Sequence, residues 1–303
     1  MAIKELSLKD KDLFHQFLNL GEHRLSVYAF ENIYLWKRLF DISWAVIDGH
    51  LCIFFQDRLG CFLYLPPLGA APSSEAVEAS FKIMDQENKD KDISRIENIE
   101  EEELAFYQAL GLVCKEKYPD YLCGRESLAG LRGKKFKSQR AAYNYFVKHY
   151  ERAYQPFSLQ DSQACLRLYR RWMQDRKAAH QGSVYGRMLS DGRLCLQTLL
   201  DNYRKLSFLG RVVKINQQIK AFTFGFKINA EIFCILYEVT DLSVKGLAQF
   251  IFREFCREMK EFRYINLMDD SGLENLQRVK LSYHPVRLIP AYIATRHEGR
   301  LSS

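Results

Sequence analysis

The sequence lacks any run of about 18 apolar residues, the length that a membrane-spanning helix requires. Its opening residues, MAIKELSLKD, also lack the apolar core of a secretion signal. We therefore expect no transmembrane segment and a cytoplasmic location.

Paired cysteines are missing too. Eight cysteines are scattered through apolar segments, with no CxxC pair and no metal-ligand spacing. In a reducing compartment such residues are core thiols. The sequence thus predicts neither a disulfide nor a metal site.

Acidic residues are absent between Ser127 and Tyr150. The same stretch carries six basic residues: Arg132, Lys134, Lys135, Lys137, Arg140 and Lys148. Gly130 and Gly133 predict a loop that leads into a helix from about Phe136. Such a helix start can hold a phosphate or carboxylate, whereas a solvated basic helix face explains the pattern equally well.

The composition is that of an ordinary globular protein, with 48% hydrophobic and 27% charged residues. A length of 303 residues favours two domains of about 150 residues each. The net charge of +7 allows a phosphate-bearing partner without requiring one.

Hydrophobic periodicity predicts the same order of elements twice: helix, helix, three antiparallel strands, helix, strand, helix, strand. In the first half, the strands are expected at 42–47, 51–56, 61–65, 93–99 and 112–122, and the helices at 7–18, 28–39, 74–86 and 101–110. In the second half, the strands are expected at 208–215, 218–227, 232–239, 264–268 and 286–293, and the helices at 159–174, 194–206, 246–262 and 273–280. The two halves show the same element order but no repeat of residues.

This order resembles that of the GNAT acyltransferase superfamily. The resemblance implies an α/β (α+β) fold of two tandem GNAT-like (acyl-CoA N-acyltransferase) domains, each a mixed, mainly antiparallel sheet flanked by helices. The expected domains are residues 1–152 and 153–303, joined near residues 151–156.

Three motifs are similar to those of the phosphatidylglycerol lysyltransferase C-terminal domain family, formerly a domain of unknown function. The first is FENIYLW from Phe30 to Trp36, followed by YLPPLG from Tyr64. The second is the run around Gly133, Lys134, Lys135, Phe136 and Arg140. The third is NLMDDSGLENLQRVKLSYHP from Asn266 to Pro285, and together the motifs follow nearly the whole chain in order.

The resemblance implies an acyltransferase or aminoacyltransferase whose donor is aminoacyl-tRNA or acyl-CoA. No cofactor is certain. tRNA or another phosphate-bearing ligand is the expected partner, and peripheral membrane contact is compatible with the basic patches. The alternative is a catalytically degenerate ligand-binding or regulatory protein that keeps the fold.

Several family positions are changed. Gln139 and Ala141 replace charged or amide residues of the basic motif, and Gln277 replaces an arginine of the closing motif. Because each charged hydrogen bond contributes about 1.5–3 kcal/mol, we predict that the chain does not perform the lysyltransferase reaction.

The second half is the better candidate for the active half. Its segment Ser243–Ala248 stands where a GNAT protein binds the cofactor pyrophosphate, so Lys245, Gly246 and Ala248 are the candidate cofactor-binding residues. The segment lacks the leading Arg or Gln of the family pattern, and ordinary turn chemistry explains it as well.

Catalysis of acyl transfer needs a proton acceptor and often an acid. Glu238 and Asp241 at a strand end, and Tyr283 in the closing motif, are the candidate catalytic residues. On sequence alone, structural roles are the favoured explanation of all three.

The remaining candidates are substrate-binding residues of the two family motifs: Lys134, Lys135, Arg140, Asn266, Asp270 and Lys280. A second basic and aromatic patch surrounds Trp172, and His180 is expected in an exposed polar loop.

Overall fold

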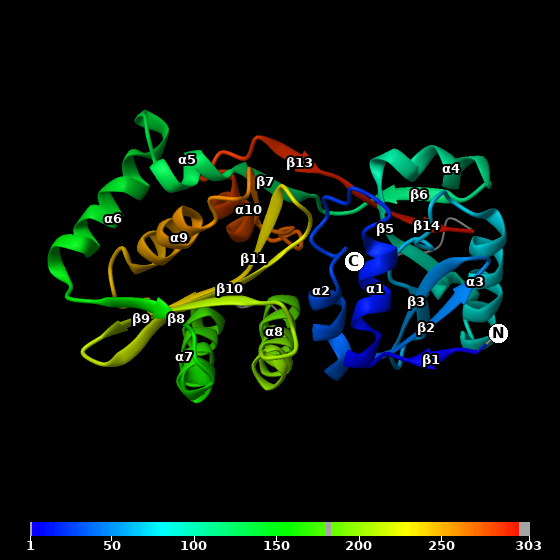
Figure 1. Cartoon of the computed structure of the whole chain (residues 1–303), viewed down its shortest axis with the longest axis horizontal. Helices are drawn as coiled ribbons and strands as arrows, with labels where there is room; N and C mark the ends of the chain where they lie inside the picture. Colours follow the sequence, from blue (N-terminus) through cyan, green and yellow to red (C-terminus); the bar gives the residue numbers. More distant parts are fainter. Residues whose placement is uncertain (1, 180–182, 297–303) are drawn as a thin grey trace. The chain divides into compact units, whose positions relative to one another are not determined.

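The computed structural model describes residues 2–179 and 183–296, and these residues form two seven-stranded sheets (Figure 1). The first sheet contains, in spatial order, β1 (Lys4–Glu5), β2 (Asp41–Ile47), β3 (His50–Gln56), β4 (Cys61–Leu63), β5 (Arg95–Glu100), β14 (Ala291–Thr295) and β6 (Val113–Glu116). The second contains β13 (Arg287–Ile289), β7 (Asp120–Gly124), β12 (Tyr264–Asn266), β11 (Ile232–Thr240), β10 (Gln218–Lys227), β9 (Leu209–Ile215) and β8 (Ala153–Pro156).

The first compact unit comprises residues 1–120, 269–272 and 288–303. Its helices are η1 (Leu8–Asp10), α1 (Lys11–Leu18), α2 (Phe30–Leu35), η2 (Trp36–Arg38), α3 (Ser74–Glu87), η3 (Lys91–Ile93), η4 (Glu101–Glu103) and α4 (Leu104–Ala109). The predicted β2–β3 hairpin is confirmed, and both residues of its turn, Asp48 and Gly49, have positive φ as a type I′ turn requires.

The second compact unit comprises residues 121–268 and 273–287. Its helices are α5 (Arg125–Gly130), η5 (Lys134–Phe136), α6 (Lys137–His149), η6 (Leu159–Asp161), α7 (Ser162–Ala179), α8 (Ser183–Asn202), α9 (Leu247–Glu258) and α10 (Glu274–Leu281). Helix α7 packs on one face of the central strands with α8 beside it, and α9 covers the other face with α5 and α6 against it (Figure 1).

Helix α9 is the amphipathic helix that the sequence predicts. Leu247, Phe250, Ile251 and Phe255 recur at helical spacing and are all buried. Gly246 precedes the helix with a φ of 82°. The helix thereby joins the end of β11 to a large apolar core.

The last strands of the two halves are exchanged, contrary to expectation. Strand β7 follows the first half in sequence but pairs with β12 of the second sheet, with Ile265 opposite Cys123. Strand β14 ends the described chain but pairs with β5 and β6 of the first sheet. The expected last strand at 286–293 is therefore two strands in different sheets. The domain boundary at 152/153 stays a prediction about which parts fold alone.

Helix α8 begins at Ser183, eleven residues before the expected start at 194. No described helix is both long and apolar enough to cross a bilayer.

The position of β14 leads to a test. A chain that ends after Ile289 lacks β14, so β5 and β6 lose the strand that lies between them. We expect the amides of β5 to lose hydrogen-exchange protection while those of β10 keep theirs. A chain that ends after Arg296 retains β14 and is the control. Equal protection of β5 in both chains would contradict the exchange.

Candidate active site

Strand β11 continues beyond its parallel partner. β11 and β12 pair over only three positions, Ile232 with Tyr264, Phe233 with Ile265, and Cys234 with Asn266. The rest of β11, residues 235–240, has no strand partner on that side within the described chain. The parallel pairing thus ends at Cys234, and we call the unpaired edge of β11 beyond it the opening of this sheet.

A β-bulge in β11 decides which face of the sheet Glu238 occupies. The pairing of β10 with β11 shifts between Phe224 and Gly225, which leaves Leu236 without a cross-strand partner. Ile235 packs in the core cluster that contains α9 residues. Because side chains alternate along a strand, the extra residue moves Glu238 to the α9 face.

Neighbouring contacts agree with this assignment. The Tyr237 hydroxyl lies on the opposite face, where it donates to the Gly192 carbonyl of α8 at 2.6 Å. Thr240 pairs with Ala221, which packs in a core cluster with residues of α9. The residues on either side of Glu238 therefore frame it on the α9 face.

Glu238 is an acid without a protein partner. Its side chain makes no hydrogen bond or ion pair with residues 2–179 or 183–296. Burial raises the pKa of its carboxyl from 4.5 to about 8. The group can therefore hold or release a proton near neutral pH.

Tyr283 and Cys256 lie close enough to Glu238 for its charge to act on both. Burial, then the Glu238 charge, raises the pKa of the Tyr283 hydroxyl well above 10.0. The same two causes raise the pKa of the Cys256 thiol. The Tyr283 ring packs on Phe252 of α9 with centroids 4.3 Å apart. Both groups are therefore protonated at neutral pH, so in proton transfer Tyr283 can first act only as a proton donor.

Asp241 lies in a different environment. It accepts hydrogen bonds from the Ser243 hydroxyl at 2.6 Å and from Lys220 at 2.9 Å, and Arg171 is 3.6 Å away. Burial raises the pKa of the Asp241 carboxyl, but these hydrogen bonds outweigh it and hold the pKa below its ordinary value. Asp241 is an ionised cap of the turn, so its catalytic role stays a prediction.

The candidate cofactor-binding residues precede and begin α9. A Cβ on Gly246 would lie 2.1 Å from the Ala142 carbonyl oxygen of α6, so close packing accounts for this glycine. Lys245 is exposed, with its ammonium 4.5 Å from the Tyr145 ring. Ala248 is a partly buried residue of the first turn. Only Lys245 offers a charge to a phosphate.

The basic stretch forms an exposed surface of the second unit. Arg132, Lys134, Lys135, Lys137 and Lys148 are exposed, and none makes an ion pair with a described residue. Arg140 differs, since it donates to the carbonyls of Leu131 and Gly133 and so closes the loop before α6. We call the five exposed residues, together with Lys245 and without Arg140, the basic surface.

The candidates of the closing motif hold local backbone. Asn266 accepts from the Met268 amide at 2.6 Å, and Asp270 accepts from the Gly272 amide at 2.9 Å. Lys280 donates to the Leu267 carbonyl at 2.7 Å. These three side chains fix turns, and their substrate-binding role stays a prediction.

In the second basic patch, the Arg176 guanidinium lies 5.5 Å from the Trp172 ring. His180 lies outside the described residues.

The bulge is the functional feature that sequence reasoning missed. An isolated glycine in a strand is a weak indication of a bulge, and Gly225 is that glycine. A Cβ there would lie 2.4 Å from the Cys234 carbonyl oxygen.

Two mixed sheets, each flanked by helices and each with a parallel pair that separates, define the class: a tandem GNAT-type fold, as found in acyl and aminoacyl transferases. The chain is similar to a tandem GNAT protein from the clavulanic acid biosynthesis pathway, with a TM-score of 0.50, 10% identity, and 98% and 99% of the two chains covered.

The family follows from the sequence comparison. The family "Phosphatidylglycerol lysyltransferase, C-terminal" matches residues 19–295, and the chain belongs to it. A protein of unknown function from Bacteroides thetaiotaomicron has a similar structure, with a TM-score of 0.86, 28% identity, and 97% and 99% of the two chains covered. L-PGS from Bacillus licheniformis has a TM-score of 0.66 at 17% identity, with 98% and 94% covered. No curated protein matches the sequence significantly.

The raised pKa of Glu238 predicts how stability depends on pH. The folded pKa is about 8 against 4.5 in an unfolded chain, so folding favours the protonated acid. The resulting stability is full below the unfolded pKa and is lost as pH rises through the folded pKa. We expect the melting temperature of Glu238→Gln, relative to the natural chain, to rise between about pH 5 and about pH 9.

Asp241→Asn is the control with the opposite sign. The folded pKa of Asp241 is depressed, so the natural carboxylate stabilises at neutral pH and loses this effect as pH falls. If the difference in melting temperature between Glu238→Gln and the natural chain does not change with pH, Glu238 is hydrated and its pKa is not raised.

Two glycines with positive φ separate backbone strain from crowding. Gly246 has a φ of 82° and faces the Ala142 carbonyl, whereas Gly49, in the type I′ turn, has a φ of 72° and has nothing within 4 Å of a Cβ. We expect Gly49→Ala to cost about 1 kcal/mol of unfolding free energy, and Gly246→Ala about 2–4 kcal/mol. Urea unfolding measures both free energies. Equal costs would mean that α6 can move away from residue 246 without loss of stability.

Proposed function

We propose that the chain transfers an aminoacyl group from aminoacyl-tRNA to an acceptor other than phosphatidylglycerol. The acceptor nucleophile attacks the carbonyl of the aminoacyl ester, and its proton passes to the Glu238 carboxylate. The ester bond to the tRNA oxygen breaks, and that oxygen takes a proton from the Tyr283 hydroxyl. Proton return from Glu238 to Tyr283 completes the cycle.

Glu238 is the observation that carries this proposal. It lies beyond the last pair of β11 with β12, it has no hydrogen-bond or ion-pair partner among the described residues, and its pKa of about 8 is close to the working pH. A proton acceptor is most effective when its pKa is near the operating pH. An acid placed only for stability would be expected to have a cation or amides around it.

The basic surface supports tRNA as the donor. Its cations have no acidic partners among the described residues, so a polyanion gains their full attraction. Acyl-CoA would instead need the start of α9. There the Ala142 carbonyl, an acceptor, lies against Gly246, and Lys245 is the single cation of the segment.

A binding protein without catalysis is the second candidate. The observation in its favour is that Asn266, Asp270 and Lys280 all satisfy backbone groups of their own region. Gln139, at a position where the family carries a charge, donates to the Ser282 carbonyl at 2.8 Å. Side chains that are occupied in this way leave fewer groups for a substrate, as expected of a protein that keeps the fold without the catalysis.

The two candidates differ in a transfer assay. Purified protein is incubated with a pool of labelled aminoacyl-tRNA and a fractionated cell extract as the source of acceptors, with vesicles of phosphatidylglycerol in a separate arm. We expect label to enter an extract fraction, no lysine to enter the lipid, and Glu238→Gln to lower the rate about 10²- to 10⁴-fold with unchanged tRNA affinity. Full transfer by Glu238→Gln would contradict the mechanism, and lysine transfer to the lipid would contradict the acceptor.

Salt dependence of tRNA binding tests the donor independently. Replacing Lys134, Lys135 and Lys137 by Gln should reduce the slope of log K against log salt by about 2–3, since each phosphate contact contributes about 0.7–0.9. The matched control replaces Lys9, Lys89 and Lys91, which are exposed lysines of the first unit, and should leave the slope unchanged. Equal effects of the two triple variants would remove the support for tRNA.

A further inference from the structure

The first unit has a cavity of its own, which the transferase proposal does not use. Its volume is about 350 Å³, and small-molecule sites span about 300–1,000 Å³. Its lining residues Phe62, Tyr64, Arg95 and Glu97 flank the one position, Leu63 with Ile96, at which the parallel strands β4 and β5 pair. All of its lining residues belong to the first unit.

One wall of the cavity is aromatic, formed by Trp36, Phe40, Phe55, Phe62 and Tyr64. Phe55 and Tyr64 stack with centroids 4.1 Å apart, and Phe40 lies 5.3 Å from Phe55. These ring contacts fix the wall before any ligand arrives. Such a surface binds an apolar body with little loss of side-chain entropy.

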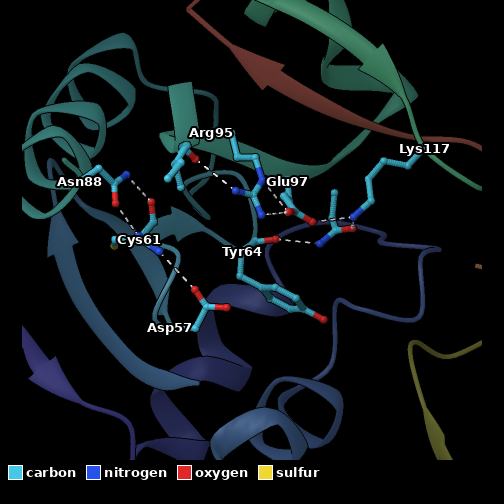
Figure 2. Close-up of polar contacts among 10 residues, drawn as sticks. Asp57, Cys61, Tyr64, Asn88, Arg95, Glu97 and Lys117 are labelled. Carbon is cyan, nitrogen blue, oxygen red and sulfur yellow. Dashed lines mark hydrogen bonds and ion pairs between the residues drawn. The ribbon is translucent and has the colours of Figure 1, made fainter. Parts of the chain in front are cut away.

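Around Glu97, the polar side of the cavity holds two cations, Arg95 and Lys117, although the complete lining carries three carboxylates against these two cations. The Glu97 carboxylate forms ion pairs with the Arg95 guanidinium, with N and O 2.7 Å apart, and with the Lys117 ammonium, with N and O 2.6 Å apart. Both cations point toward this carboxylate (Figure 2). Burial raises the pKa of the Glu97 carboxyl, but Lys117 and Arg95 outweigh it and hold the pKa below its ordinary value. One ionised carboxylate thus faces two cations.

Both cations keep N–H groups that have no partner among the described residues. Arg95 donates to Glu97 and to the Ile93 carbonyl, and its guanidinium has five N–H groups in all. Lys117 donates to Glu97 and, at 3.0 Å, to the Asn98 side chain, so one of the three N–H groups of its ammonium remains. The guanidinium carbon of Arg95 also lies over the Phe62 ring, 4.2 Å from the ring centroid.

Asn98 holds this polar side in place at a cost in backbone strain. Its φ is 59°, an unusual value inside a strand. The side-chain amide of Asn98 donates to the Tyr64 backbone carbonyl at 2.8 Å. The backbone carbonyl of Asn98 accepts from the Tyr28 hydroxyl at 2.8 Å. These two hydrogen bonds fix Asn98, and with it the side-chain carbonyl that accepts from Lys117.

Two further acids line the cavity and limit the charge of a ligand. Asp57 is exposed and accepts from the Leu59 amide at 2.8 Å, while Asp269 accepts from the Ser271 amide at 2.6 Å. Both are occupied by their own turns. Their charge disfavours a dianion more than a monoanion.

We propose that this cavity binds a small amphiphilic monocarboxylate, with its aromatic or alkyl body against the aromatic wall and its carboxylate on Arg95 and Lys117. The two cations already share one carboxylate, and a second would complete their hydrogen bonding. The site binds its ligand independently of transfer in the second unit.

Calorimetric titration of the full chain with three probes of similar shape tests the ligand class: phenylacetate, phenylacetamide and phenethylamine. We expect phenylacetate to bind about ten- to hundredfold more tightly than the neutral amide, because only the acid engages both cations. The amine should bind most weakly. Binding of the amide or the amine as tight as that of the acid, or no binding of the acid, would overturn the proposal.

Variants locate the binding. Lys117→Met should remove most of the preference for the acid and leave the affinity for the amide unchanged, and Lys117→Arg should keep the preference. The matched control is Lys115→Met, an exposed lysine of strand β6 that lies two residues before Lys117 and does not line the cavity. Phe40→Ala should weaken acid and amide equally. If Lys117→Met and Lys115→Met behave alike while both melt as the natural chain does, the acid binds elsewhere and the proposal is wrong.

Discussion

The brevity of the parallel strand pairs is the constraint on which the functional regions depend. β4 and β5 share one paired position in the first sheet, and β11 and β12 share three in the second. Where so short a pairing ends, the backbone groups of the opening need other partners or solvent. The cavity of the first unit is lined by residues that flank the β4–β5 pair, and Glu238 of the second unit lies beyond the last β11–β12 pair.

What lies at each opening is decided by small irregularities of neighbouring strands. In the second sheet, Leu236 is the extra residue that turns Glu238 toward α9. In the first, Asn98 takes a positive φ within β5 and fixes both Tyr64 and Lys117. A regular strand would point different side chains into each opening. The fold therefore supplies the place, and the bulge and the turned residue supply the chemistry.

Local patterns predicted the elements well, and long-range pairing poorly. The hairpin at Asp48 and Gly49 and the apolar stripe of α9 follow from residues close in sequence, so the predictions were confirmed. The exchange of β7 and β14 has no local pattern, since the residues of either strand suit either sheet. The start of α8 was missed because Gly186 and Gly192 oppose a helix; yet a Cβ on Gly192 would lie 2.6 Å from the Tyr169 hydroxyl, so packing explains that glycine. Glu238 was a sequence candidate, whereas its unpaired state depends on the bulge and needed coordinates.

The two carboxyl groups beside the openings show how one architecture supports two kinds of site. Glu238 meets no cation, so burial alone acts and raises its pKa to about 8. Glu97 meets Arg95 and Lys117, whose charges more than offset burial and lower its pKa. A group that exchanges a proton near neutral pH suits catalysis, whereas a permanently ionised group suits the fixing of cations that bind a ligand. The electrostatic surroundings, rather than the fold, therefore favour transfer in the second unit and binding in the first.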